Sequence, residues 1–211
     1  PALAVEHGIL EFAPRRPDLV ISGVNFGANV SVDVTISGTV GAALEAGSFG
    51  IPSLAISLEM DAAYYLTGDS AANYDSARVY SRLLAEALLS HGMPRGVDVL
   101  NVNIPSDATV QTPWRRTRLS RFRYFTPMGP DRSRTPARPR YEVIRDPSIT
   151  EPNSDLHVLL VDRQGSITPL SLDLTVPTSD YLFEHQTAGE IVNYQTISTP
   201  TFSLLEETVK A

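Results

Sequence analysis

PDLVISGVNFGANVSVDVTISGTVGAALE, residues 17–45, is the stretch of this chain that decides its fold class. It begins with a short apolar run, 18–22, of the kind that forms a buried strand in a parallel sheet. A loop rich in glycine and asparagine follows, and Ser37-Gly38-Thr39 then opens a helix of small residues over 40–48. α/β proteins hold anionic ligands with this order of strand, polar loop and helix start at the carboxyl end of the sheet. The stretch therefore predicts a phosphate site.

Helices and strands alternate along much of the chain, which predicts βαβ units and a parallel sheet. The clearest helix has apolar residues three and four apart and closes at His91-Gly92. A turn at Gln164-Gly165 separates the last two strands. The predicted helices are 1–14, 40–48 and 74–91, and the predicted strands are 18–22, 53–57, 98–104, 157–162 and 166–170.

Four parts of the chain, in the same order, resemble the SurE family and cover most of it to about Leu170. SurE proteins are metal-dependent phosphatases that act on nucleoside monophosphates. The resemblance implies a Rossmann-like, three-layer α/β fold with a parallel sheet, an extended β-hairpin arm and carboxyl-terminal β elements. The matching parts are ISGVNFGAN (21–29) with SGTVGAALE (37–45) and GIPSLAIS (50–57), then LNVNIP (100–105), Thr117-Arg118, and GSITPL (165–170).

One part of the family pattern is absent from this sequence. Family members open with a strand that ends in Asn-Asp-Asp-Gly, whose two aspartates bind the metal, and this chain contains no Asp-Asp pair. The sequence begins at Pro1, and residues 1–14 read as the helix that precedes the first strand. We therefore expect that the amino-terminal third or quarter of the protein lies outside this chain. Half of the metal site would lie there, which leaves the catalytic residues unassigned.

Asn25 is the candidate metal ligand. It lies just past the carboxyl end of the predicted strand, where ligands bind in open α/β sheets. Its amide oxygen is a hard, neutral donor that suits Mg²⁺ or Mn²⁺. The resemblance implies the same role, because SurE relatives use the asparagine at this place as a ligand. The alternative is a turn asparagine that bonds its own backbone.

Ser37, Gly38 and Thr39 are the candidate phosphate-binding residues. A helix start exposes N–H groups and a partial positive charge, and two hydroxyls flank a glycine that permits close approach. The alternative is a simple N-cap, which needs only one Ser or Thr. Both roles can hold together.

Gly23, Asn29 and Asp33 are weaker candidates for residues that support the metal ligand. Gly23 would permit a backbone conformation that residues with a Cβ resist. Asp33 would orient the loop or stand behind the metal ligands. A solvated loop carboxylate is the alternative for Asp33.

The charge of the chain is distributed unevenly. The net charge is −7, yet residues 115–145 contain ten arginines against Asp131 and Glu142, a net charge of +8. A single basic segment on an acidic body argues against a partner such as a nucleic-acid duplex. It fits either a rim that attracts a phosphorylated ligand or a β face that meets acidic groups on another subunit.

The sequence divides into three parts of one domain. Residues 1–106 form a truncated α/β core with the phosphate and metal loop. Residues 107–153 are rich in arginine and proline and predict an extended arm without helices. Residues 154–211 predict carboxyl-terminal β elements and a tail.

Composition and resemblance together define the expected function. The chain has no cysteine and no apolar run of membrane length, which excludes a disulfide scaffold and predicts no membrane partner. The resemblance implies hydrolysis of nucleoside 5′- and 3′-monophosphates with one divalent ion, Mg²⁺ or Mn²⁺, by a cytoplasmic homodimer or tetramer. One amide ligand cannot hold such an ion, so the chain alone is expected to be inactive. The alternative is a non-catalytic, oligomeric module that binds nucleotide or phosphate.

Overall fold

The computed structural model describes residues 1–60, 74–130, 132–133, 140–143, 146 and 150–175. Residues 1–173 form one compact unit. Three of the ten arginines of the basic segment and the predicted tail beyond residue 175 lie outside the described residues. No helix in the described ranges is long and apolar enough to cross a membrane.

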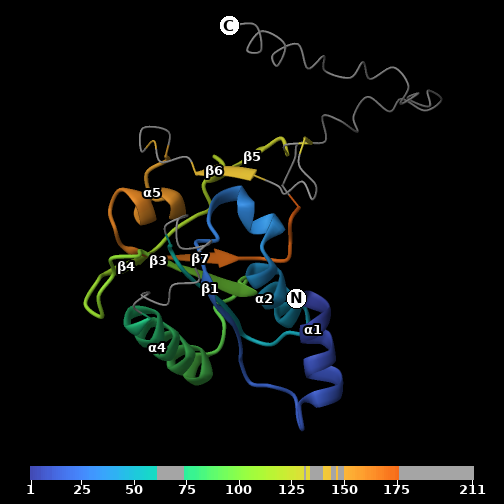
Figure 1. Ribbon diagram of the computed structural model, residues 1–211. Helices are drawn as coiled ribbons and strands as arrows, with labels where there is room; N and C mark the ends of the chain where they lie inside the picture. Colours follow the sequence, from blue (N-terminus) through green and yellow to red (C-terminus); the bar gives the residue numbers. More distant parts are fainter. Residues whose placement is uncertain (61–73, 131, 134–139, 144–145, 147–149, 176–211) are drawn as a thin grey trace, which may run out of the picture. The chain divides into compact units, whose positions relative to one another are not determined.

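A five-stranded sheet lies at the centre of this unit (Figure 1). Its order is β1-β2-β3-β7-β4, with β1 (Val20–Phe26), β2 (Ser53–Leu58) and β3 (Val99–Ile104) parallel. β7 (Gly165–Leu170) is antiparallel to β3, and β4 (Trp114–Arg116) is parallel to β7. The predicted parallel half is present, but the whole sheet is mixed. The chain returns from β3 to β4 through a loop without a crossover helix, so the direction reverses.

Helices cover both faces of the sheet. α2 (Gly38–Ser48) packs on one face and α4 (Asp75–His91) on the other (Figure 1). α1 (Ala2–His7), extended by the π-helical turn η1 (Gly8–Phe12), lies beside α2. The predicted helices and the three-layer α/β architecture are confirmed. The core on the α4 face comprises Leu54, Ile56, Leu58, Leu100, Val102 and Ile104 of the sheet and Ala77, Tyr80, Leu84 and Leu88 of the helix.

The first strand is not buried as predicted. β1 is the edge of the sheet and pairs only with β2 among the described residues. Ile21 is 44% exposed and Val24 39%. An apolar run indicates a strand but not its place in the sheet, so the prediction erred on position alone.

The predicted strand over 157–162 is wrong. These residues belong mostly to the helix α5 (Asp155–Leu160). Ser154 caps it, since its side chain accepts a hydrogen bond from His157 N at 3.1 Å. Leu156, Val158 and Leu159 are buried, and Leu156 and Leu159 pack in one cluster with Val30 and Tyr124. A short apolar run suits a strand or a helix equally, and the cap decides between them here.

In its described residues the arginine-rich segment is only in part separate from the body, and the extended arm stays a prediction. β5 (Phe125–Met128) and β6 (Arg140–Val143) form an antiparallel pair, and the described residues between 107 and 153 contain no helix. β4, however, belongs to the central sheet, and Tyr124 is buried against Val30 and α5. The boundaries at 106 and 153 stay a prediction.

Candidate functional site

A tight loop after β1 brings the candidate residues to the carboxyl ends of the parallel strands. Gly23 has φ +121°, and a Cβ on it would lie 2.3 Å from the carbonyl oxygen of Ile56. The peptide bond from Gly23 to Val24 is cis. Gly27 has φ +117° and donates its N–H to Leu58 O at 2.8 Å. Glycine at both positions lets the loop lie directly against β2.

Asn25 is half-buried within this loop. Its Nδ2 donates to Gly27 O at 2.7 Å, which is the backbone contact of a turn asparagine. Its Oδ1 accepts no hydrogen bond from the described residues. The turn role is therefore present, the oxygen is free for a cation, and the ligand role stays a prediction.

Asn29 is an anchor of the loop. Its backbone N–H donates to Asn103 Oδ1 at 2.7 Å, and its Nδ2 donates to Ser57 Oγ at 2.8 Å. Its carbonyl oxygen accepts from Nδ2 of Asn101 at 2.8 Å and of Asn103 at 3.0 Å. Both β3 asparagines are fully buried. Sequence reasoning missed them, although two asparagines on the same face of an otherwise apolar strand were the signal.

The helix start at Ser37 forms as predicted. Ser37 Oγ accepts from Val40 N at 3.1 Å, so Ser37 is an N-cap. A Cβ on Gly38 would lie 2.8 Å from Cγ of Pro1, so a larger residue there would displace Pro1. Thr39 is half-buried. The cap is established, while phosphate binding at these three residues stays a prediction.

Asp33 is buried, not solvated. It is 5% exposed, and its Oδ2 accepts the backbone N–H groups of Tyr124 at 3.0 Å and Phe125 at 2.9 Å. Its Oδ1 accepts from Nη1 of Arg123 at 3.2 Å. Asp33 therefore orients the loop against the arginine-rich segment, and the alternative of a solvated carboxylate is wrong.

Asp155 is a second buried carboxylate that sequence reasoning missed. Its Oδ2 accepts from Ser31 N at 2.8 Å, and its Oδ1 accepts from Ser120 N at 2.9 Å and Leu156 N at 2.8 Å. Burial raises the pKa of Asp155 to about 6, against the opposing effect of these backbone N–H groups. The Ser-Asp pair at 154–155 signals a helix start but not contacts so distant in sequence.

The arginines divide between two roles. Arg115 pairs with Asp162 and Arg123 with Asp33, so these two meet acidic groups of their own chain. Arg116, Arg118 and Arg121 are exposed and could meet a phosphorylated ligand or another subunit. Both roles stay predictions.

The residues described do not by themselves compose a site for a divalent cation. Asn25 offers one neutral oxygen, whereas the oxygens of Asp33 and Asp155 are taken by N–H groups. In the described ranges no three His, Cys, Asp or Glu side chains cluster. A hard cation prefers carboxylates, so Asn25 could be only one member of a ligand set.

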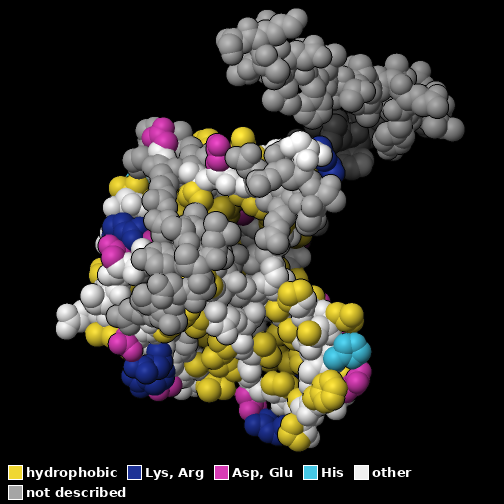
Figure 2. All heavy atoms as spheres, viewed as in Figure 1, with side chains coloured by type: hydrophobic (Ala, Val, Ile, Leu, Met, Phe, Trp, Pro, Cys, Tyr) yellow, Lys and Arg dark blue, Asp and Glu magenta, His cyan; other side chains and the backbone are white. Residues whose placement is uncertain are grey.

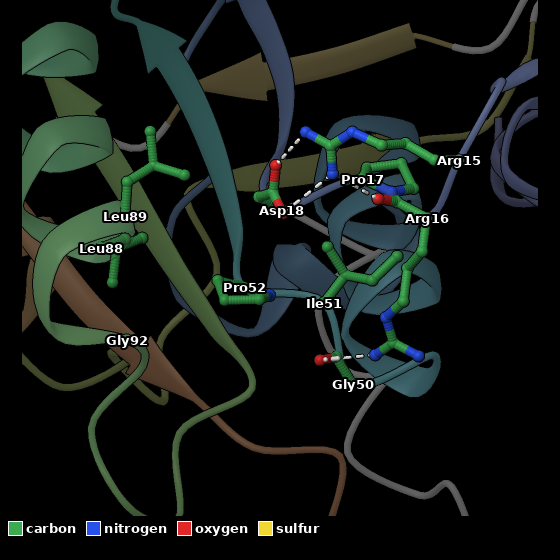
Figure 3. Close-up of a pocket in the computed structure, with 10 residues that line it drawn as sticks. All are labelled: Arg15, Arg16, Pro17, Asp18, Gly50, Ile51, Pro52, Leu88, Leu89 and Gly92. Atoms are coloured by element: carbon green, nitrogen blue, oxygen red, sulfur yellow. Dashed lines mark hydrogen bonds and ion pairs between the residues drawn. The ribbon is translucent and has the colours of Figure 1, made fainter.

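A pocket of about 550 Å³ lies at the other end of the parallel strands, where β1 and β2 begin (Figure 3). It is bounded by the segment before β1, where Arg15 donates to Asp18 at 2.6 and 3.1 Å, and by the end of α4 at Leu88 and Leu89. Arg16 closes a third side and donates to Gly50 O at 3.0 Å. Because these residues precede β1 and β2, the pocket is not the predicted site.

The fold and the loop after β1 define an α/β protein with a Rossmann-like sheet. A Gly/Asn loop and a capped helix start lie at the carboxyl ends of its parallel strands. Comparison with known families narrows the class. The family model described as "Survival protein SurE" matches residues 1–126, and the chain belongs to the SurE family.

Individual relatives agree with this assignment. The "5'-nucleotidase SurE" of Thermococcus gammatolerans is 42% identical over 159 residues, which are 75% of this chain and 59% of the relative. That of Methanocella arvoryzae is 44% identical over 169 residues, 77% of this chain and 62% of the relative. The chain thus spans about three fifths of the length of these curated relatives. The crystal structure of the SurE protein from Aquifex aeolicus matches with a TM-score of 0.63 at 27% identity, covering 87% of this chain and 73% of that one.

Proposed function

We propose that the protein containing this chain is a metal-dependent phosphatase that hydrolyses nucleoside 5′- and 3′-monophosphates to nucleoside and phosphate. The observation that carries the proposal is the placement of the Asn25 loop and the Ser37 helix start in a chain of the SurE family. Relatives that share 42–44% of the aligned residues bear the name 5'-nucleotidase. The chemistry proposed is that of a phosphoric monoester hydrolase.

The helix start of α2 would bind the phosphoryl group. The first N–H groups of a helix have no partner within the helix. They give this end of the helix a partial positive charge, which attracts an anion such as phosphate. The N–H groups of Gly38 and Thr39 lie at this place, while Ser37 Oγ already bonds Val40 N. Fixed donors of this kind stabilise the charge that spreads over phosphoryl oxygens during transfer.

A divalent ion, Mg²⁺ or Mn²⁺, would neutralise the phosphate and activate water when bound. Asn25 Oδ1 would supply one ligand, held in place by the bond from Nδ2 to Gly27 O. The carboxylates such an ion requires are not available among the described residues. We therefore propose that the 211-residue chain by itself has little or no activity.

The protein is further proposed to be cytoplasmic and a homodimer or tetramer. The support for self-association lies in the β5–β6 pair, where Met128 is 38% and Tyr141 55% exposed. Aromatic and thioether side chains of this size favour burial against a partner.

Two samples test the proposal, the chain itself and the full product of the gene that encodes it. Release of inorganic phosphate from nucleoside 5′- and 3′-monophosphates is measured with Mg²⁺ or Mn²⁺ and with a chelator. We expect metal-dependent release by the full product and almost none by the chain. Nucleotide binding without hydrolysis by the full product would instead identify the non-catalytic module.

A further inference from the structure

The connector between the two halves of the proposed site is held by two buried carboxylates. This connector is the 3₁₀ helix η2 (Ser31–Ile36), which begins two residues after Asn29 and ends at the N-cap Ser37. Its position sets how the Asn25 loop lies relative to the start of α2. A 3₁₀ turn of this length has little stability of its own, so its position depends on outside contacts.

Asp155 fixes the beginning of the connector. It accepts the N–H of Ser31 on one oxygen and the N–H groups of Ser120 and Leu156 on the other. Ser31 is a non-glycine residue at φ +59°, a conformation that needs support from its surroundings. One fully buried side chain thus joins three segments far apart in the sequence.

Asp33 fixes the middle of the connector to the segment that contains Ser120. It accepts the N–H groups of Tyr124 and Phe125, and Arg123 donates to its other oxygen. The Oγ of Ser31 lies 3.4 Å from Asp33 Oδ2, so the two carboxylates meet at one residue. Glu151 completes the attachment, because it accepts from Ser120 Oγ at 2.6 Å and Arg121 N at 3.0 Å.

The carboxylate at position 155 determines which backbone segments meet. Burying a charge is costly, and none of the contacts described for Asp155 is with a cation. An apolar side chain would avoid that cost but would leave the N–H groups of Ser31, Ser120 and Leu156 without their acceptor, which also costs stability. What a carboxylate adds is the choice of which backbone atoms meet, since each oxygen accepts from a different segment.

We infer that Asp33 and Asp155 are positioning residues of the phosphatase site, which clamp η2 to the segment 118–125 and so fix the Asn25 loop relative to the start of α2. The inference rests on the proposed function. It assigns to the arginine-rich segment a part in the activity that its charge alone does not reveal. Neither carboxylate touches the substrate.

Four variants of the full gene product test the inference. Asp155→Asn replaces one of the two acceptor oxygens by a donor, and both of these oxygens accept from buried backbone N–H groups. Asp33→Asn makes the same replacement more mildly, because only one of its oxygens accepts from the backbone and the other accepts from the exposed Arg123. Leu88→Ala opens the core on the α4 face and loses stability without touching the clamp. Asp75→Asn repeats the Asp155 substitution in the first turn of α4, where the side chain is exposed.

The measurements are kcat per folded molecule, KM, the affinity for inorganic phosphate, and the amide hydrogen exchange of Ser31 and Tyr124. We expect kcat to fall about a hundredfold in Asp155→Asn, because misplacement of about 1 Å costs that much, with a smaller change in KM. Phosphate should bind more weakly, and the two amides should exchange faster. Leu88→Ala and Asp75→Asn should keep the kcat of the parent.

The outcomes separate the inference from the proposed function. If the parent is active and the two clamp variants differ from Leu88→Ala in no respect, the carboxylates are structural and the inference fails alone. If Asp155→Asn does not fold, the milder Asp33→Asn decides by the same comparison. A parent that neither hydrolyses nucleotides nor binds phosphate removes the proposed function, and the inference with it.

Discussion

Asn25 has two possible tasks that a pair of substitutions can separate. Its Nδ2 bonds Gly27 O, whereas its Oδ1 is the predicted metal ligand. Asn25→Asp loses the donor but keeps an oxygen, and Asn25→Ala loses both. In the full gene product we expect Asn25→Ala to weaken Mn²⁺ binding at least tenfold and Asn25→Asp to retain it. Both should lose about 1 kcal/mol of stability with the turn bond.

Calorimetric titration with Mn²⁺ and urea unfolding give the two quantities. If both variants bind Mn²⁺ as the parent does while losing stability equally, Asn25 is only a turn residue. Asn25→Asp that binds no Mn²⁺ would also contradict the ligand role.

Gly23 is the residue whose backbone the loop depends on most. Its φ of +121° is disfavoured by any side chain, and a Cβ would meet Ile56 O at 2.3 Å. We expect Gly23→Ala to lower the free energy of unfolding by about 3 kcal/mol or more. Gly96→Ala is the control, because Gly96 has φ +76° but open space around it, and it should lose only about 1 kcal/mol. Equal losses, measured by urea denaturation, would show that the contact with β2 is not limiting.

At the scale of elements, the start of α2 combines a cap with a proposed phosphate site. Thr39→Ala keeps the cap, whereas Ser37→Ala removes the acceptor for Val40 N. We expect Ser37→Ala to cost about 1 kcal/mol of stability and Thr39→Ala much less. If the helix start binds phosphate, both should weaken inhibition by inorganic phosphate in the full gene product. Thr39→Ala with unchanged inhibition would exclude the Thr39 hydroxyl from the phosphate site, because this variant keeps the backbone N–H of residue 39.

The first turn of α5 should make stability depend on pH. Burial raises the pKa of Asp155 to about 6, whereas an exposed aspartate has a pKa of 3.8. The folded state therefore holds this proton more tightly, and the contribution of Asp155 to stability falls as pH rises from about 4 to 6. The loss is about 3 kcal/mol over that window. Asp155→Asn should remove this slope.

Urea unfolding of parent and variant at several pH values between 4 and 7 compares the two slopes rather than the absolute stabilities. Equal slopes, or a carboxyl carbon resonance of Asp155 that titrates below 4, would mean that the three backbone N–H groups outweigh burial.

The elements show why sequence reasoning succeeded in some places and not in others. α4 and β3 carry regular patterns of apolar residues, and the small-residue helix after Ser37 has its own cap signal, so local information was sufficient. α5 is too short for its period to distinguish helix from strand. The contacts of Asp33 with Tyr124 and of Asp155 with Ser31 join residues 91 and 124 positions apart, which no local pattern encodes.

At the scale of the whole molecule, part of the exposed apolar surface lies on the amino-terminal helix. Figure 2 shows hydrophobic side chains gathered at the end that carries α1, where Leu3, Leu10 and Phe12 are exposed. The edge strand β1 contacts α2, and α2 also packs against α1. An exposed apolar helix surface favours association, so purified chain should be handled at low concentration.

The β5–β6 pair is the proposed site of self-association, and its exposed side chains allow a test that spares the core. Met128 and Tyr141 are exposed on opposite faces of this pair, because Met128 lies opposite Arg140 and Tyr141 lies opposite Pro127. β4 and Tyr124 nearby belong to the body, so deletion of the whole arm would damage the sheet. We expect Met128→Ser with Tyr141→Ser to shift the full gene product from dimer or tetramer toward monomer. Because an arginine-rich segment of charge +8 would face an acidic body, salt should weaken the parent assembly as well.

Leu89→Ser replaces an exposed leucine on α4, is the matched control and should leave the assembly unchanged. Sedimentation velocity at two salt concentrations gives the assembly state of the parent, the double variant and the control. A monomeric parent, or a double variant that assembles as the parent does, would exclude the β5–β6 pair as the interface.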